Sequence, residues 1–179
     1  ASVVNALSSW VEVTVYKNGK IHNIRFENGG HTTEPLKVVG DCEEDRTGTW
    51  VTFKPDAEIF DTDIYDYNTL KVRIRELAFL NKGLKITLRD DRDEEDTTGE
   101  TFVYEGGISE YVKFINNEKT AIHDNIIHLE GTEDNVVFEV ALQYTNGYND
   151  NIYSFVNNIN THDGGTHEEG VKRALTRVI

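Results

Sequence analysis

A strict alternation of valine with polar residues near the start of the chain predicts antiparallel β-structure. Val11, Val13 and Val15 are separated by single polar residues, a spacing typical of a strand with one buried face. Asn18-Gly19 follows, the residue pair that the tightest hairpin turn prefers. Apolar residues return in alternation at 24–26. We therefore expect a two-stranded hairpin here, which needs further strands or helices to cover its apolar face.

The apolar spacing changes from strand-like to helical and back along the rest of the chain. Apolar residues from Tyr67 to Lys82 fall on one helical face, and Gly83 is a typical helix stop. Residues 84–88 alternate again. Further expected elements are a loop or weak edge strand over 29–47, strands near 50–54, 102–104, 126–130, 136–144 and 151–157, and helices over 108–115 and from 166 to the end. Helices mixed with antiparallel strands predict the α+β class.

The composition limits the compartment and the partners. The chain has 179 residues, a single cysteine and a net charge of −14. One cysteine cannot form an internal disulfide, which suits the reducing cytoplasm, and no apolar run is long enough to cross a membrane. A protein that grips DNA over most of its surface is basic, so we expect any DNA contact to be local and weak.

Two groups of residues contain the side chains that metal ions use, but neither is interpreted as a metal site. The acidic run at 90–99 lacks the spaced ligands of a calcium loop, so it is expected to be an exposed turn and a domain boundary. His162 and His167 lie close in sequence but without zinc-like helical spacing. No metal ligand is assigned, and no nucleophile elbow is found.

A glycine-rich segment near the C-terminus predicts a tight turn into a helix. In Asp163-Gly164-Gly165-Thr166-His167-Glu168-Glu169-Gly170, the glycine pair permits a backbone that other residues avoid. Thr166 and Glu169 have the spacing of a capping box.

Several strings of residues, in one order, carry a family resemblance. They are Ala1-Ser2-Val3-Val4-Asn5-Ala6-Leu7-Ser8, Thr47-Gly48-Thr49-Trp50-Val51-Thr52-Phe53, Arg75 to Gly83, Tyr104-Glu105-Gly106-Gly107-Ile108, Gly147-Tyr148, Asn157-Asn158-Ile159 and Asp163 to Gly170. The chain resembles the ATPase subunits of bacterial type IIA topoisomerases, and the gyrase-type subunits more than those of topoisomerase IV.

This resemblance implies an architecture and an activity. Residues 1–98 match the C-terminal part of a GHKL-type ATP-binding domain, a helix layer on an antiparallel sheet, and residues 99–179 match the first part of a transducer domain with a ribosomal-protein-like βαβ arrangement. The implied cofactors are ATP and Mg²⁺. The implied activity is ATP-driven closure of a DNA gate and strand passage, as in negative supercoiling. DNA, the gyrase A subunit and a second copy of the ATPase region are the implied partners.

The resemblance assigns binding residues but no catalytic residue. Ala1, Ser2, Val3, Thr49 and Val51 match positions around the adenine, and Lys17 matches the rim of the inhibitor pocket, where many gyrases carry arginine. Lys172, Arg173 and Arg177 match a helix that borders the DNA cavity; a solvated helix face that complements the helix dipole is the alternative.

The family's catalytic groups and its adenine-reading Asp match no position of this chain. Its general base, its Mg²⁺-holding Asn and its adenine-reading Asp precede the matched region, and its γ-phosphate Lys follows it. We therefore expect a piece of a longer subunit that does not hydrolyse ATP alone. The absence of any methionine, even at position 1, agrees with a piece. The alternative is a non-catalytic interaction module that keeps the fold.

Overall fold

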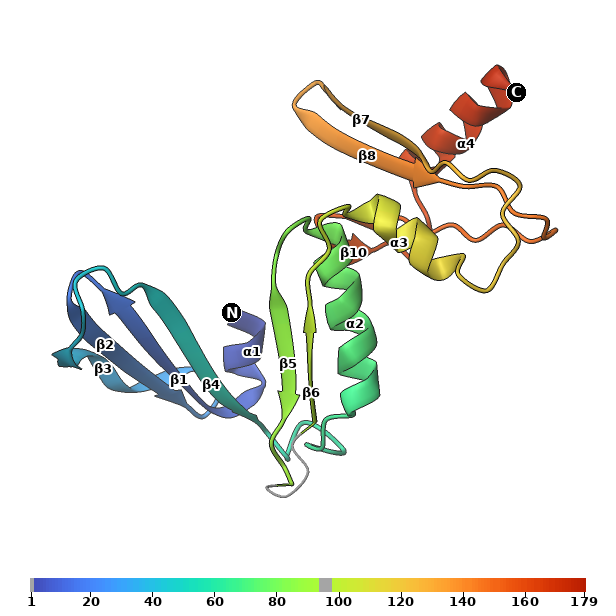
Figure 1. Cartoon of the computed structure of the whole chain (residues 1–179). Coiled ribbons are helices and arrows are strands. Elements are labelled where there is room, and N and C mark those ends of the chain that lie inside the picture. The colour runs from blue at the N-terminus through green and yellow to red at the C-terminus, as the bar shows by residue number, and fades with distance from the viewer. Residues whose placement is uncertain (1, 94–97) are drawn as a thin grey trace. The chain divides into compact units, whose positions relative to one another are not determined.

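The computed structural model describes residues 2–93 and 98–179 (Figure 1). The chain divides into two compact units, the first ending at Tyr65 and the second beginning at Asp66. This division by contacts falls before the predicted boundary between domains 1–98 and 99–179, which concerns family domains and stays a prediction. No helix among the described residues is both long and apolar enough to cross a membrane.

The first unit is built on a four-stranded antiparallel sheet in the order β3–β2–β1–β4. Its elements are α1 (Ser2–Ala6), β1 (Ser8–Lys17), β2 (Lys20–Glu27), β3 (His31–Asp41) and β4 (Gly48–Pro55). The predicted β1–β2 hairpin is confirmed, with Lys17 paired to Lys20. Asn18 and Gly19 both have positive φ, 52° and 69°, as the type I′ turn requires.

For residues 29–47 the sequence predicted either a loop or a weak edge strand. The structure forms a strand, β3, over part of this segment. β3 pairs with β2 through several register shifts, which are common at sheet edges. Pro35 lies in this strand, and a proline is tolerated there because an edge strand has backbone groups that need no partner strand.

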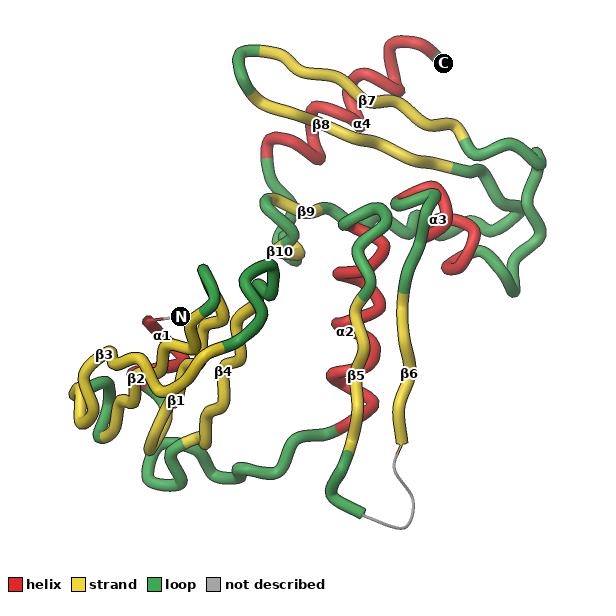
Figure 2. The backbone as a smooth tube through the Cα atoms, turned by 60° about the vertical axis from the view of Figure 1, so that its left-hand side comes forward, coloured by secondary structure: helices red, strands yellow, loops and turns green. Residues whose placement is uncertain are grey.

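In its described residues, 66–93 and 98–179, the second unit combines three helices with three two-stranded antiparallel sheets. Its elements are α2 (Tyr67–Leu80), β5 (Ile86–Asp90), β6 (Thr98–Phe102), α3 (Ile108–Ile115), β7 (Ile127–Glu133), β8 (Val136–Leu142), β9 (Phe155–Val156), β10 (Ile159–Asn160) and α4 (Thr166–Val178). α2 runs beside the β5–β6 hairpin (Figures 1 and 2). The predicted α+β class is confirmed.

α2 begins and ends close to its predicted bounds. Asp66 accepts a hydrogen bond from the Thr69 backbone N–H at 2.7 Å, which satisfies a donor that the first turn leaves open. The helix ends at Leu80, two residues before the predicted Lys82, and the Asn81 side chain donates to the Leu77 carbonyl at 2.7 Å.

Aromatic rings from α2, α3 and the β6–α3 loop form the core of the second unit. Phe79 is 2% exposed, and its ring stacks on Tyr104 with centroids 3.6 Å apart and on Tyr111 at 5.0 Å. Such pairs add to the burial of apolar area. Gly107, which precedes α3, is buried and adopts φ 58°, ψ −132°. Its backbone carries the chain from the Tyr104 stack into α3.

The capping box predicted at the start of α4 is wrong. The cap residue is Gly165, with φ 155° and no side-chain cap hydrogen bond, and Thr166 is already the first helical residue. Glu169, the predicted second member, instead pairs with Arg173. A glycine cap satisfies no donor, but its missing Cβ permits the backbone that this turn requires.

Candidate functional site: the apolar sheet face and helix α4

One face of the four-stranded sheet carries most of the residues predicted to surround a nucleotide. Val15 pairs directly with Thr49, and Val13 pairs with Val51. Directly paired residues of an antiparallel ladder project to the same side of the sheet. This side, the apolar sheet face, consists of Val11, Val13, Val15, Ile24, Phe26, Val51 and Phe53, with Thr49 and His22 at the end nearest the β1–β2 turn.

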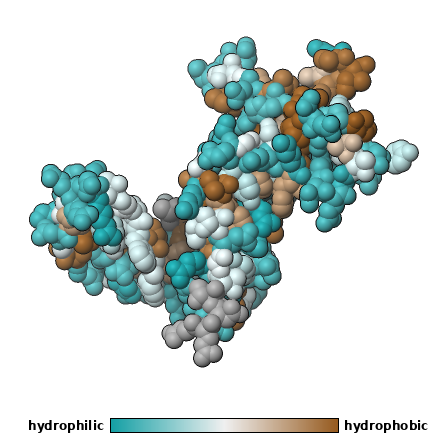
Figure 3. Space-filling model, viewed as in Figure 1, coloured by the Kyte–Doolittle hydropathy of each residue, from teal (hydrophilic) through white to brown (hydrophobic). Residues whose placement is uncertain are grey.

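The apolar sheet face is well covered at only one of these positions. Val11 is 5% exposed, whereas Val51 is 52% and Phe53 is 41% exposed. Figure 3 shows hydrophobic residues at several separate places on the molecular surface, among hydrophilic ones. Val51 and Phe53 are exposed apolar residues on the same side of one strand. Exposed apolar residues that gather in this way can form a binding surface, so this face is suited to a flat apolar ligand or a further protein segment.

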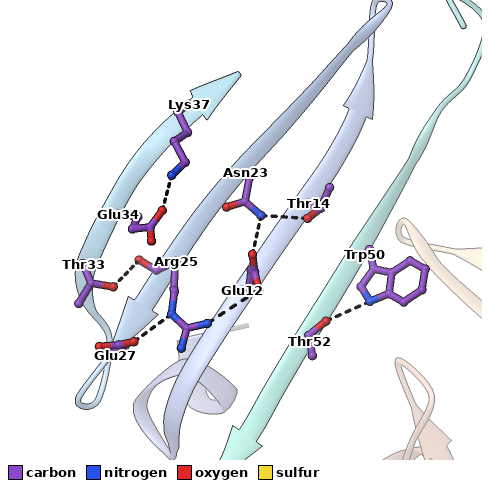
Figure 4. Close-up of polar contacts among 10 residues, drawn as sticks. All are labelled: Glu12, Thr14, Asn23, Arg25, Glu27, Thr33, Glu34, Lys37, Trp50 and Thr52. Carbon is purple, nitrogen blue, oxygen red and sulfur yellow. Dashed lines mark hydrogen bonds and ion pairs between the residues drawn. The ribbon is translucent and has the colours of Figure 1, made fainter. Parts of the chain in front are cut away.

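The opposite face of the sheet satisfies its own polar groups (Figure 4). The buried Asn23 amide donates to Glu12 at 2.9 Å and to Thr14 at 3.0 Å. The Arg25 guanidinium donates to Glu27 at 2.9 Å, and Trp50 Nε1 donates to Thr52 Oγ1 at 3.0 Å. Because these groups already hold partners, this polar face offers less to a ligand than the apolar sheet face does.

The remaining residues of the predicted pocket lie at the margins of the first unit. Lys17 is the last residue of β1 and lies two residues after Val15, so both are on the same side of the strand. Val15 pairs with Thr49, so Lys17 is on the side of Thr49. Ser2 and Val3 lie in α1, which packs against β1, and Val3 is 69% exposed. Ala1 lies outside the described residues. The roles of these residues stay predictions.

Two of the three predicted DNA-contacting residues on α4 are engaged in ion pairs within the helix. Lys172 Nζ lies 2.7 Å from Glu168 Oε1, and Arg173 Nη2 lies 3.2 Å from Glu169 Oε2. Among the described residues, no ion pair to Arg177 is found. Arg177 is therefore the α4 cation whose charge is least compensated.

The N-terminal end of α4 carries a polar cluster that sequence reasoning did not find. Ser154 donates to Glu168 at 2.8 Å and shares a 2.7 Å hydrogen bond with Thr161. Thr161 in turn hydrogen-bonds His167 Nε2 at 3.0 Å. A cavity of about 430 Å³ adjoins these residues, lined by Ile152, Tyr153, Ser154, Asn160, Thr161, His162, Asp163, Gly164 and Glu168. The ion pair to Lys172 first, and the Ser154 hydroxyl second, lower the pKa of the Glu168 carboxyl.

A model of the DNA gyrase B family matches residues 107–179. Over the whole chain, the sequence is 51% identical to the DNA gyrase B protein of Halalkalibacterium halodurans, of which it covers 28%. It is also 51% identical to the DNA gyrase B protein of Bacillus mycoides, of which it covers 43%. The chain thus spans less than half the length of these curated relatives.

Two solved structures share the fold over nearly the whole chain. The 43K ATPase domain of Thermus thermophilus gyrase B, solved in complex with an aminocoumarin, has a TM-score of 0.85 and 41% identity, with 99% of this chain and 47% of that one covered. The gyrase B protein from Myxococcus xanthus has a TM-score of 0.84 and 27% identity, with 97% and 50% covered. Sequence and fold agree along the chain, which belongs to the DNA gyrase B family.

Proposed function

We propose that this chain is part of the ATP-hydrolysing subunit of a type II DNA topoisomerase, in which ATP binding and hydrolysis close a DNA gate and drive strand passage. Similarity to gyrase B proteins over the whole chain supports this proposal. The partners in that assembly are DNA, the gyrase A subunit and a second copy of the ATPase region, in the cytoplasm.

Within this subunit, the apolar sheet face serves as one wall of the adenine pocket. The observation that supports this assignment is that Thr49 projects from β4 on the same side as the half-exposed Val51, next to Val15 on β1. A purine ring has apolar faces and a polar edge, so valine side chains suit its faces and a hydroxyl suits its edge. Ser2 and Val3 of α1, with Ala1, complete the proposed wall.

No catalytic residue and no Mg²⁺ ligand for the ATPase reaction is assigned to this chain. The nucleotide-facing residues are valine, threonine and serine, which neither deprotonate water at neutral pH nor hold Mg²⁺ as carboxylates do. The chain thus contributes adenine recognition, while phosphoryl transfer depends on groups supplied elsewhere in the subunit.

Thr49→Val in an intact subunit is expected to weaken binding of a non-hydrolysable ATP analogue by about tenfold. The substitution keeps the side-chain shape but removes one hydrogen-bonding hydroxyl, whose loss in a closed pocket costs about 1 kcal/mol or more. Calorimetric titration of the intact protein with the analogue and Mg²⁺ measures the change.

Thr52→Val is the matched control, because Thr52 lies on the same strand but on the polar face. This variant is expected to bind the analogue like the unmodified protein. Equal affinity of all three proteins would refute the adenine wall. If no nucleotide bound to the unmodified intact protein, the non-catalytic interaction module would be the better interpretation.

Arg177→Gln is expected to weaken DNA binding by an intact subunit and to lower the slope of log K against log salt by about one. Arg177 is exposed in the last turn of α4, where a family transducer helix borders the DNA passage. Arg173→Gln is the control, since its guanidinium is paired with Glu169. Fluorescence anisotropy at several salt concentrations tests this, and a slope for Arg177→Gln equal to that of the unmodified protein would exclude a phosphate contact at Arg177.

A further inference from the structure

The β7–β8 hairpin places one histidine and two glutamates on the same face. Glu130 and Glu139 pair directly across the two strands, and His128 pairs with Ala141 two residues away. Alternation along each strand then puts His128, Glu130 and Glu139 on one side. The turn is tight, with Asp134 and Asn135 at φ 47° and 64°, which fixes this register.

The ligand atoms of these three side chains converge. One nitrogen of His128 and one carboxylate oxygen from each glutamate all lie within 4.8 Å of one another. His128 Nε2 is 2.9 Å from Glu139 Oε1. Ligand atoms of a tetrahedral zinc ion, at about 2.0–2.2 Å from the metal, are themselves about 3.3–3.6 Å apart. Small side-chain movements therefore suffice to bring all three onto one ion.

Across the described residues, neither facing glutamate has a permanently charged partner, although Glu139 forms an ion pair with the His128 ring when that ring is protonated. Like charges directly opposite in a sheet are destabilising. Among the described residues, no lysine or arginine forms an ion pair with Glu130 or Glu139. The carboxylate at the end of β5 differs, because Asp90 is paired with Arg92, which lowers the pKa of Asp90 to about 2. A cation bound at the β7–β8 face would relieve the repulsion between Glu130 and Glu139.

We propose that His128, Glu130 and Glu139 form a surface site for a divalent transition-metal ion of the Zn²⁺ class. An imidazole with two carboxylates suits zinc, nickel or copper, whereas magnesium and calcium prefer oxygen ligands alone. All three residues are exposed, so solvent completes the coordination. The site shares no residue with the proposed adenine wall, so this proposal does not depend on the assignment of that wall.

Titration of the purified chain with ZnCl₂ tests the site, followed by calorimetry and by the ¹H–¹⁵N resonances of the histidine rings. We expect one site of distinct affinity and a selective shift of the His128 ring. His128→Ala and Glu139→Gln should each weaken binding by at least about tenfold, since even loss of an outer-shell partner costs about 10–100-fold. His31→Ala, at an exposed histidine on β3, should leave it unchanged.

Circular dichroism of each variant shows whether the fold is kept, and the ring resonances report on the site without any substitution. Equal zinc affinity in His128→Ala, Glu139→Gln and the unmodified chain would overturn the proposal. So would zinc-dependent shifts spread evenly over all histidines, because these would indicate general attraction to an acidic surface.

Discussion

Phe79→Ala is expected to destabilise the second unit by about 3–5 kcal/mol, the usual range for removing a buried aromatic ring. The Phe79 ring is 2% exposed and lies 3.6 Å from the Tyr104 ring centroid. Its loss leaves a cavity beneath Tyr104 and Tyr111 and removes both stacking contacts. Urea unfolding followed by near-ultraviolet circular dichroism, which reports on tyrosine packing, measures the change in the free energy of unfolding.

Phe114→Ala is the matched control for this experiment. Phe114 belongs to the same aromatic cluster, with its centroid 5.5 Å from that of Phe79, but it is 47% exposed. Because water already reaches this ring, its removal should cost clearly less. Equal losses for both variants would show that the Phe79 stack is not the centre of this core.

Gly107→Ala is expected to cost about 1–3 kcal/mol through backbone strain alone. Gly107 has φ 58° and ψ −132°, a conformation essentially confined to glycine. An added Cβ would meet Lys82 Cβ at 3.5 Å and the Phe79 carbonyl oxygen at 3.7 Å, which are ordinary contacts. The cost therefore comes from the dihedral angles and not from a clash.

Gly170→Ala separates backbone strain from a general effect of replacing glycine. Gly170 lies inside α4, and apart from its chain neighbours and the surrounding helix backbone, an added Cβ would find no atom within 4 Å. Alanine is favoured over glycine within a helix by about 1 kcal/mol, so this variant should be more stable. Thermal unfolding of both variants tests the opposite signs; a neutral Gly107→Ala would mean that the backbone there relaxes easily.

Sequence alone predicted those parts of the fold whose determinants are local. The Asn18-Gly19 turn carries its own conformational preference, and α2 carries an apolar stripe that is followed by the stop residue Gly83. The N-cap of α2, Asp66, was not predicted. The α4 start was predicted wrongly because a capping box and a glycine cap share the same neighbourhood in sequence. Its true cap became clear only from the dihedral angles of Gly165.

The candidate sites divide in the same way. The two ion pairs of α4 were accessible from the sequence, because Glu168–Lys172 and Glu169–Arg173 have the i, i+4 spacing that pairs charges on a helix. The proposed metal site on the β7–β8 hairpin could not be predicted from the sequence. Its geometry depends on the strand register, and a one-residue change of register would move Glu139 to the other face. No metal was assigned to His128 from the sequence, since its ligand partners are set by strand pairing.

Contacts with the short β9–β10 turn also required the tertiary structure. Arg73 Nη2 donates to the Asn158 carbonyl at 2.8 Å, and the Asn158 amide donates to Asn81 Oδ1 at 3.1 Å. No local pattern links these residues, which are 77 or more positions apart. The Asn157-Asn158 pair was recognised as part of a family string, and its structural role is to join this turn to α2.

The way the strands pair has a consequence for how rapidly the chain can fold. Among the described strands, every pairing except β1–β4 joins neighbours in the sequence. Hairpins close within microseconds, and local contacts keep the contact order low. β4 must instead find β1 after β2 and β3 have intervened, which costs more loop-closure entropy. Thr49 and Val51 lie on β4, so the strand that carries the proposed adenine wall is the one whose pairing is slowest to form.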